Sequence, residues 1–301
     1  CSSAMRGSIL TGQYPLTHGV LGDHIALRGE GPSIARLLSS ASYRTGFIGK
    51  WHLDGPDGGV FTPAGIRRQG FQYWAAYNHN PFHFEGFYFR DTPEPVWVDT
   101  WTPHALTELT IDYLREAVTK PEPFCLFLSW GPPQGFPDQV PTKFLKEYQP
   151  DHLRVRPNTV GPDRKSLAGY YANITGLDWN MGRLIKALDH LGLADNTIVV
   201  FTSDVGDQLY SHDPVIGTVP WRETLMVPLI VRWPGHIPAG AVEEAPFGLV
   251  NLMPTLLQII GMPIPAGVEG KAMPHMLLGR EGARPHSELI LYPLARQVDQ
   301  A

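Results

Sequence analysis

Residues 43–53 read YRTGFIGKWHL, a short apolar run that ends in a lysine and a histidine two positions apart. The segment from Thr45 to Ile48 predicts a strand buried on both faces, because it is short, apolar and bounded by turn residues. Lys50 and His52 follow at the carboxyl end of this strand, which is the edge where open α/β sheets place their binding sites. The stretch therefore predicts a strand that brings two basic side chains to a site.

Three more strands of the same kind are predicted later in the chain, over residues 124–130, 197–202 and 227–233. We expect the strands that end near Ile48, Trp130 and Thr202 to lie in one sheet, with the polar residues that follow them converging at its edge.

Helical periodicity is clearest over residues 167–191, where apolar residues recur every three or four positions up to Gly192. Shorter helices are predicted over residues 33–40, 104–118 and 249–260, the last with Asn251 as its capping residue. Helices that alternate with strands predict an α/β protein with a central, mostly parallel or mixed sheet sandwiched by helices. The composition turns small and polar near residue 240, so we expect one α/β domain over residues 1–240. Residues 241–301 would continue it and begin a smaller C-terminal region.

The composition excludes several other classes of protein. The chain has 301 residues, of which 43% are hydrophobic, so it can bury a full core. The net charge is −5 and no polybasic run occurs, so neither nucleic acid nor a membrane surface is expected as a partner. Two cysteines exclude a disulfide framework. No apolar run reaches the roughly 18 residues of a membrane span.

Two further segments carry candidate chemistry. Residues 2–12 read SSAMRGSILTG, in which small hydroxylated residues precede a possible helix start, where backbone N–H groups favour an anion. Residues 196–204 read NTIVVFTSD, an apolar strand that ends in an acidic residue, Asp204. Taken alone, the first segment is also an ordinary capped helix and the second an ordinary loop cap.

Together these segments resemble the sulfatases, the formylglycine-dependent members of the alkaline-phosphatase superfamily. Residues 2–12, continued by QYPLTHGV, resemble the signature in which Cys or Ser, any residue, Pro or Ala, any residue and Arg lead to Leu-Thr-Gly. Residues 43–53 are similar to the second signature, and the similarity continues through VPLIVRWPG at residues 227–235 and through residues 251–270. The resemblance implies an alkaline-phosphatase-like α/β fold.

The resemblance also implies roles for particular residues. A maturase converts the first signature residue to formylglycine, whose hydrated aldehyde is the nucleophile. An ungapped alignment places Ser2 there, whereas a register with one inserted residue places Cys1 there.

The remaining roles follow the same resemblance. Arg6 would hold the modified residue, Lys50 would contact sulfate and His52 would help to deprotonate the hydrated aldehyde. Asp204 would bind Ca²⁺ together with the modified Ser2, since carboxylate oxygen suits this hard cation.

The sequence departs from the family pattern at three positions. Val205 stands where the family has Asn or His, Gln134 stands where it has a proton-donating His, and Gly217 stands where it has a sulfate-binding Lys. A strand carrying paired acidic metal ligands would precede residue 1, so we expect an N-terminally truncated fold with a weakened Ca²⁺ site. Gln134 and His212 remain candidate substrate contacts.

These observations predict a sulfatase-like hydrolase of sulfate monoesters, impaired by the substitutions, whose substrate is a sulfated small molecule or glycan. One alternative is a non-catalytic relative that binds a sulfated glycan or a protein partner; another is a phosphate or phosphonate monoester hydrolase. The aromatic and histidine residues between 73 and 88, which include His79, His83 and Phe84, would line the substrate cleft or pack as a loop. A periplasmic or extracellular location is expected if a signal peptide precedes the chain.

Overall fold

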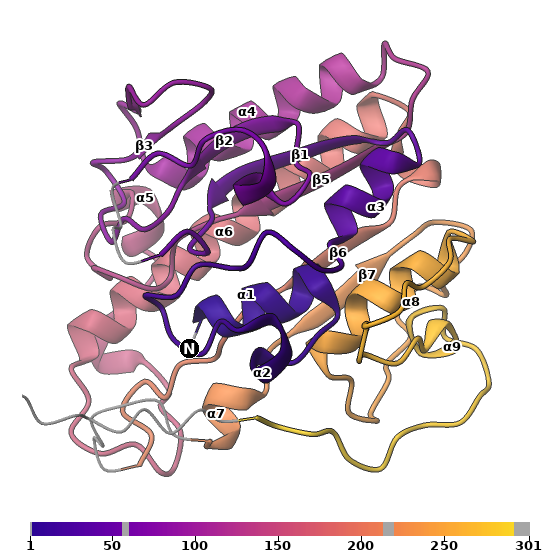
Figure 1. Ribbon diagram of the computed structural model, residues 1–301. Coiled ribbons are helices and arrows are strands. Elements are labelled where there is room, and N and C mark those ends of the chain that lie inside the picture. The colour runs from indigo at the N-terminus through magenta and orange to yellow at the C-terminus, as the bar shows by residue number, and fades with distance from the viewer. Residues whose placement is uncertain (1, 56–59, 213–219, 292–301) are drawn as a thin grey trace, which may run out of the picture.

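The computed structural model describes residues 2–55, 60–212 and 220–291 (Figure 1). The strands are β1 Arg44–Lys50, β2 Tyr73–Tyr77, β3 Phe87–Tyr88, β4 Val96–Trp97, β5 Phe124–Ser129, β6 Val199–Thr202 and β7 Leu229–Arg232. The helices are α1 Ser2–Thr11, α2 Pro15–His18, α3 Ile34–Ser40, α4 Thr102–Ala117, α5 Thr142–Leu145, α6 Arg164–His190, α7 Arg222–Leu225, α8 Leu252–Ile259 and α9 Pro274–Leu277.

The central sheet is parallel, with β1 between β2 and β5. β1 and β5 confirm the predicted strands, whereas β2 was not predicted as a strand. Its sequence belongs to the aromatic cluster that we expected to line a cleft or to pack in a loop. Trp74 and Tyr77 of this strand are instead buried, because β2 is hydrogen-bonded along β1 and both of its faces are covered.

Two helical layers cover the central sheet. On one face, Phe47 of β1 packs with Leu38 of α3 and Leu10 of α1. On the other face, Ile48 packs with Leu106 of α4, since successive side chains of a strand point to opposite faces. α4 also packs along the long helix α6, and Figure 1 shows both on the side of the sheet away from α1. The predicted α/β sandwich is therefore confirmed.

β6 and β7 form a separate antiparallel pair. The expectation that β6 would share one hydrogen-bonded sheet with β1 and β5 is therefore wrong for the described residues. β6 pairs with β7 along one edge. β5 pairs with β1 along one edge, and no described strand pairs with its other edge. A cleft of about 1880 Å³ lies between the central sheet and the β6–β7 pair. It is lined by β5, β6 and parts of α1, α6 and α8.

The predicted helices are present, with one capping hydrogen bond missing. α6 begins after Asp163, whose carboxylate accepts hydrogen bonds from the backbone N–H groups of Lys165 and Ser166. It ends just before Gly192, which has a φ of 68°. Asn251 occupies the N-cap position of α8, as predicted, but its side chain makes no capping hydrogen bond, because its amide donates to Glu288 and accepts from the backbone N–H of Lys271.

The part of the chain after residue 240 packs against the N-terminal helix. Met253 and Leu257 of α8 are fully buried in the same cluster as Leu10 of α1. The proposed boundary near residue 240 stays a prediction. Of the described helices, none is long and apolar enough to cross a membrane.

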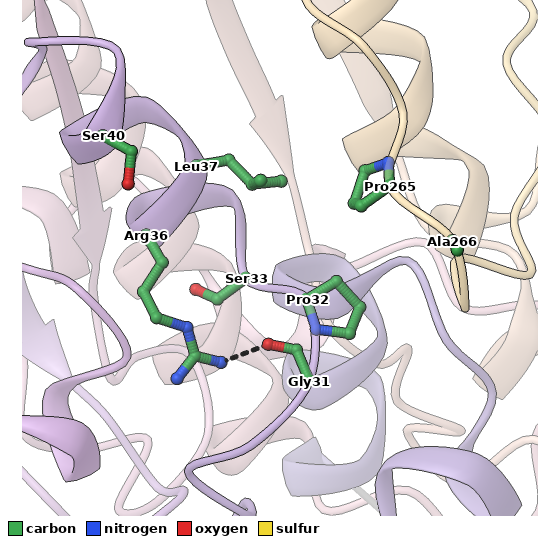
Figure 2. A pocket seen from close by; sticks show the side chains of 8 residues that line it. All are labelled: Gly31, Pro32, Ser33, Arg36, Leu37, Ser40, Pro265 and Ala266. Carbon is green, nitrogen blue, oxygen red and sulfur yellow. Dashed lines mark hydrogen bonds between the residues drawn. The ribbon is translucent and has the colours of Figure 1, made fainter.

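A pocket of about 340 Å³ lies between α3 and residues 265–266 (Figure 2). The guanidinium of Arg36 donates to the carbonyl oxygens of Gly29 and Gly31, and Figure 2 shows the bond to Gly31. Because these carbonyl oxygens already bind the Arg36 guanidinium, the pocket does not have the character of an anion site.

Candidate active site

Ser2 lies at the first position of α1, where its side chain faces Asp204. Asp204 lies in the loop after β6. The Ser2 hydroxyl donates to Oδ2 of Asp204 over 2.5 Å, and only 6% of Ser2 is exposed. α1 is held in place by His18, whose Nε2 lies 3.1 Å from the Ser8 hydroxyl. A Cβ at Gly7 would lie 2.7 Å from the same imidazole, so the helix can approach His18 only with glycine there.

Arg6 lies one helical turn after Ser2 and on the same face of α1. Its Nε is 2.7 Å from Oδ2 of Asp204 and 3.3 Å from the Ser2 hydroxyl. Its Nη1 donates to the backbone oxygen of Lys50 over 2.6 Å and to the Ser129 hydroxyl over 2.8 Å. Arg6 thus connects α1, the carboxyl ends of β1 and β5, and the loop after β6.

The carboxyl group of Asp204 is kept ionised by these contacts. Burial alone would raise its pKa, but the Arg6 guanidinium and the Ser2 hydroxyl bond hold the pKa below its usual value. Asp204 therefore carries a charge that Arg6 already balances.

Lys50 is the last residue of β1 and only 4% exposed. Its Nζ donates to Oε1 of Gln134 over 2.9 Å. Burial and the nearby Arg6 lower the pKa of Lys50 to about 8, while Asp204 and Asp23 act in the opposite direction. The side chain is therefore a buried cation that remains mostly protonated near pH 7.

His52 occupies a strained backbone conformation two residues beyond the strand, with a φ of 56°. Its Nδ1 is buried and has no hydrogen-bond partner within the described ranges. The ring of His79 lies 5.1 Å away. Burial and Lys50 lower the pKa of His52 to about 4, so its imidazole is neutral near pH 7.

The structure thus brings Ser2, Arg6, Lys50 and Asp204 together in one cleft. Their roles remain predictions. Cys1 and Gly217 lie outside the described residues.

Two neighbours of this cluster were missed by sequence reasoning, namely Asp23 and Ser129, whereas His79 belongs to the segment that we expected to line a cleft or to pack as a loop. Asp23 accepts a hydrogen bond from the backbone N–H of Ser3 over 3.2 Å and lines the same cleft. Burial would raise its pKa, but the hydrogen bond from the Ser3 backbone lowers it. Asp23 stands in no sequence motif, whereas Ser129 lies near the carboxyl end of a predicted strand, at the edge where site residues are expected.

The described side-chain contacts of His212 are with residues outside the Ser2 cluster. Its ring stacks on Trp221 with centroids 4.4 Å apart, and its Nε2 is 3.4 Å from a carboxylate oxygen of Glu223. The side chain of Asn158 also approaches the imidazole. None of these partners belongs to the Ser2 cluster, so a substrate contact of His212 stays a prediction.

The described residues do not fit Ca²⁺ on their own. They contain no group of three or more His, Cys, Asp or Glu side chains that could hold a metal ion. Ca²⁺ takes about six to eight oxygen ligands, whereas the Asp204 carboxylate is paired with Arg6. The side chain after Asp204 is that of Val205, which offers no oxygen.

A parallel sheet that ends in a cluster of two cations, a hydroxyl and a carboxylate defines a class of α/β proteins that bind oxyanions at the sheet edge. The family model for sulfatases matches residues 1–262, and the chain belongs to the sulfatase family of the alkaline-phosphatase superfamily.

Curated relatives support this assignment. The chain is 35% identical over 286 residues to an ulvan-active sulfatase of Formosa agariphila, covering 90% of the chain and 55% of that protein. It is 28% identical to an endo-4-O-sulfatase of Bacteroides thetaiotaomicron, covering 99% of the chain and 66% of that protein. The chain therefore spans only between half and two thirds of the length of these relatives.

A solved structure shows the same fold. The yidJ sulfatase of Bacteroides fragilis superposes with a TM-score of 0.87 at 29% identity, over 93% of the chain and 68% of that structure. The alkaline-phosphatase-like fold that the sequence resemblance implied is thus confirmed.

Proposed function

We propose that this chain forms the sulfate-binding part of a sulfatase that hydrolyses sulfate monoesters. The observation that carries the proposal is the placement of two cations, Arg6 and Lys50, beside the Ser2 hydroxyl in one cleft. Buried cations with unused N–H donors bind tetrahedral oxyanions strongly, because the bonds are charge-assisted and poorly screened.

Lys50 is the residue best suited to contact the sulfate. One of its three N–H donors is used on Gln134, which leaves two for sulfate oxygens. Arg6 has a different task, since its guanidinium is engaged by protein oxygens. It holds Ser2 and Asp204 in register with the ends of β1 and β5.

Ser2 is the residue that we propose for conversion to formylglycine by a formylglycine-generating maturase. The modification would supply a hydrated aldehyde whose hydroxyl acts as the nucleophile. His52 is neutral near pH 7 because burial lowers its pKa, so its imidazole can accept a proton. Its Nδ1 lacks a hydrogen-bond partner in the described residues, which leaves that nitrogen uncommitted.

The chain as given should hydrolyse its substrates slowly. Gln134 places an amide next to Lys50, and an amide does not protonate a leaving alcohol. Val205 supplies neither a metal ligand nor a sulfate contact, and the described residues do not fit Ca²⁺. Gly217, the third altered position, lies outside the described residues. These losses also support the alternative of a non-catalytic relative that binds a sulfated glycan.

The proposed substrate class is a sulfated glycan. The two relatives reported above are named for activity on ulvan and for 4-O-sulfate removal. Hydrolysis of phosphate or phosphonate monoesters remains a second possibility for the same oxyanion cleft.

Peptide mass spectrometry after co-expression with the maturase tests the modification. The Ser2 side chain should lose about 2 Da as its alcohol becomes an aldehyde, and a Ser2→Ala variant should show no change. Modification of Cys1 in place of Ser2 would select the other register, and an unmodified peptide would favour the non-catalytic alternative.

Calorimetric titration with inorganic sulfate tests the anion site. Lys50→Met should abolish binding, while Lys186→Met, which removes an exposed lysine of α6, should leave it unchanged. Equal binding by both variants would refute the site. Rates on 4-nitrophenyl sulfate and 4-nitrophenyl phosphate then distinguish the two ester classes.

A further inference from the structure

Two loops that border the active site are locked together by a buried histidine. His83, from the loop before β3, is only 2% exposed. Its ring nitrogens lie 2.9 Å from the carbonyl oxygen of Gln134 and 3.0 Å from that of Gln139, both in the loop after β5. The backbone oxygen of His83 accepts from both the N–H and the hydroxyl of Thr102.

The two loops approach so closely that a side chain would not fit between them. Gly135 has a φ of 113°, and a Cβ there would lie 2.5 Å from the backbone oxygen of Pro81. The arrangement of these loops is therefore fixed by backbone contacts and is not a chance meeting of flexible side chains.

Each loop contributes one phenylalanine to a stacked pair on the surface. The rings of Phe82 and Phe136 stack with centroids 5.1 Å apart and an interplanar angle of 21°. They are nevertheless 40% and 45% exposed. An aromatic pair that is held rigidly and left open to solvent is an unusual use of apolar surface and indicates a binding site.

Both loops are also connected to the catalytic cluster. Gln134, two residues before Phe136, accepts the hydrogen bond from Lys50. His79, three residues before Phe82, lies against the ring of His52. Both phenylalanines therefore lie within a few residues of groups that contact Lys50 or His52.

We infer that Phe82 and Phe136 form a stacking platform for a pyranose ring of a sulfated carbohydrate. This inference rests on the proposed function and names the part of the substrate beyond the sulfate. The pair offers flat apolar surface for the C–H face of a sugar, while the sugar hydroxyls stay in water. Because the two rings face each other, an outer ring face of the pair is what remains for one sugar unit, and the pair is too small for a stable protein interface, which buries about 800 Å² on each side.

The inference predicts separate effects on carbohydrate and on sulfate. Affinity is measured by calorimetry with sulfated ulvan oligosaccharides and with inorganic sulfate as two independent probes. Phe82→Ala and Phe136→Ala should each weaken oligosaccharide binding about tenfold and leave the Kd for inorganic sulfate unchanged. Phe136→Tyr should retain oligosaccharide affinity because it keeps the flat ring, whereas Phe136→Leu should lose it.

Trp179→Ala provides the matched control. This aromatic residue of α6 is 44% exposed, and its described ring contacts are with His104 and Phe144. Its replacement should alter neither affinity. Oligosaccharide affinities within twofold of the wild type in both Phe→Ala variants would overturn the platform, as would an equal loss of inorganic sulfate binding. A wild-type protein that binds inorganic sulfate but no oligosaccharide also overturns the platform, whereas failure to bind inorganic sulfate overturns the proposed function itself.

Discussion

Replacing Arg6 by methionine should destabilise the fold more than any exposed ion-pair substitution. Methionine keeps much of the volume of the side chain and removes its charge and its hydrogen bonds. The variant leaves the Asp204 carboxylate without its cation, and the backbone oxygen of Lys50 and the hydroxyl of Ser129 without their donor.

The magnitude follows from burial. The Arg6 and Asp204 side chains are only 14% and 19% exposed. Removing one partner of a buried ion pair costs about 3–5 kcal/mol, because the remaining charge is left unpaired. The partial exposure of this pair favours the lower end, and the orphaned hydrogen-bond acceptors add about 1 kcal/mol. We therefore expect the free energy of unfolding to fall by about 4 kcal/mol.

Urea unfolding of a double-mutant cycle tests this value. Asp204→Asn should be destabilising alone, and the double variant should be more stable than the sum of the single losses predicts, with a coupling energy of about 2 kcal/mol or more. Arg115→Met is the control, because Arg115 pairs with Asp112 at 62% and 64% exposure and should cost less than about 0.5 kcal/mol. A coupling energy near zero would show that Arg6 does not hold Asp204.

Three further predictions concern the chemistry. On the acid side, hydrolysis of 4-nitrophenyl sulfate should keep its rate until pH falls through about 4, where the imidazole of His52 becomes protonated; an inflection near the ordinary histidine pKa would contradict its burial. Affinity for inorganic sulfate should fall as pH rises through about 8, because deprotonation removes the Lys50 charge. The Lys50→Arg variant should bind sulfate equally below and above this pH, because arginine stays protonated. Gln134→His should raise kcat/KM for alkyl sulfates about 100-fold and for 4-nitrophenyl sulfate much less, because a nitrophenolate leaves without a proton; equal gains would show that the introduced imidazole takes no part in leaving-group protonation.

The sequence was sufficient for the elements whose signal is local. The strand around Phe47 and the long helix that begins at Arg164 carry their periodicity within one segment. The convergence of Lys50 and Asp204 also followed, because polar residues after buried strands meet at one edge of an α/β protein.

The incorrect or missing predictions depend on partners far along the chain. β2 was missed because its aromatic residues read equally as a loop, and only pairing with β1 makes them a strand. Asn251 stands at the predicted N-cap position but makes no capping hydrogen bond, because Glu288 and the backbone of Lys271 engage its amide. Asp23 reaches the site through a backbone bond to Ser3 that no spacing rule specifies.

Gln134 shows why a substitution in a family motif cannot be interpreted as a simple loss. Its side chain accepts the hydrogen bond of Lys50, and its backbone oxygen faces the imidazole of His83. Gln134 therefore also connects Lys50, which we propose as the sulfate contact, to the loop of the aromatic pair. A histidine at this position would restore an acid, but it would place an ionisable ring beside the Lys50 ammonium, which lowers the pKa of the new imidazole. The gain in leaving-group protonation should consequently be greatest at low pH, a dependence that separates a restored acid from a general improvement in folding.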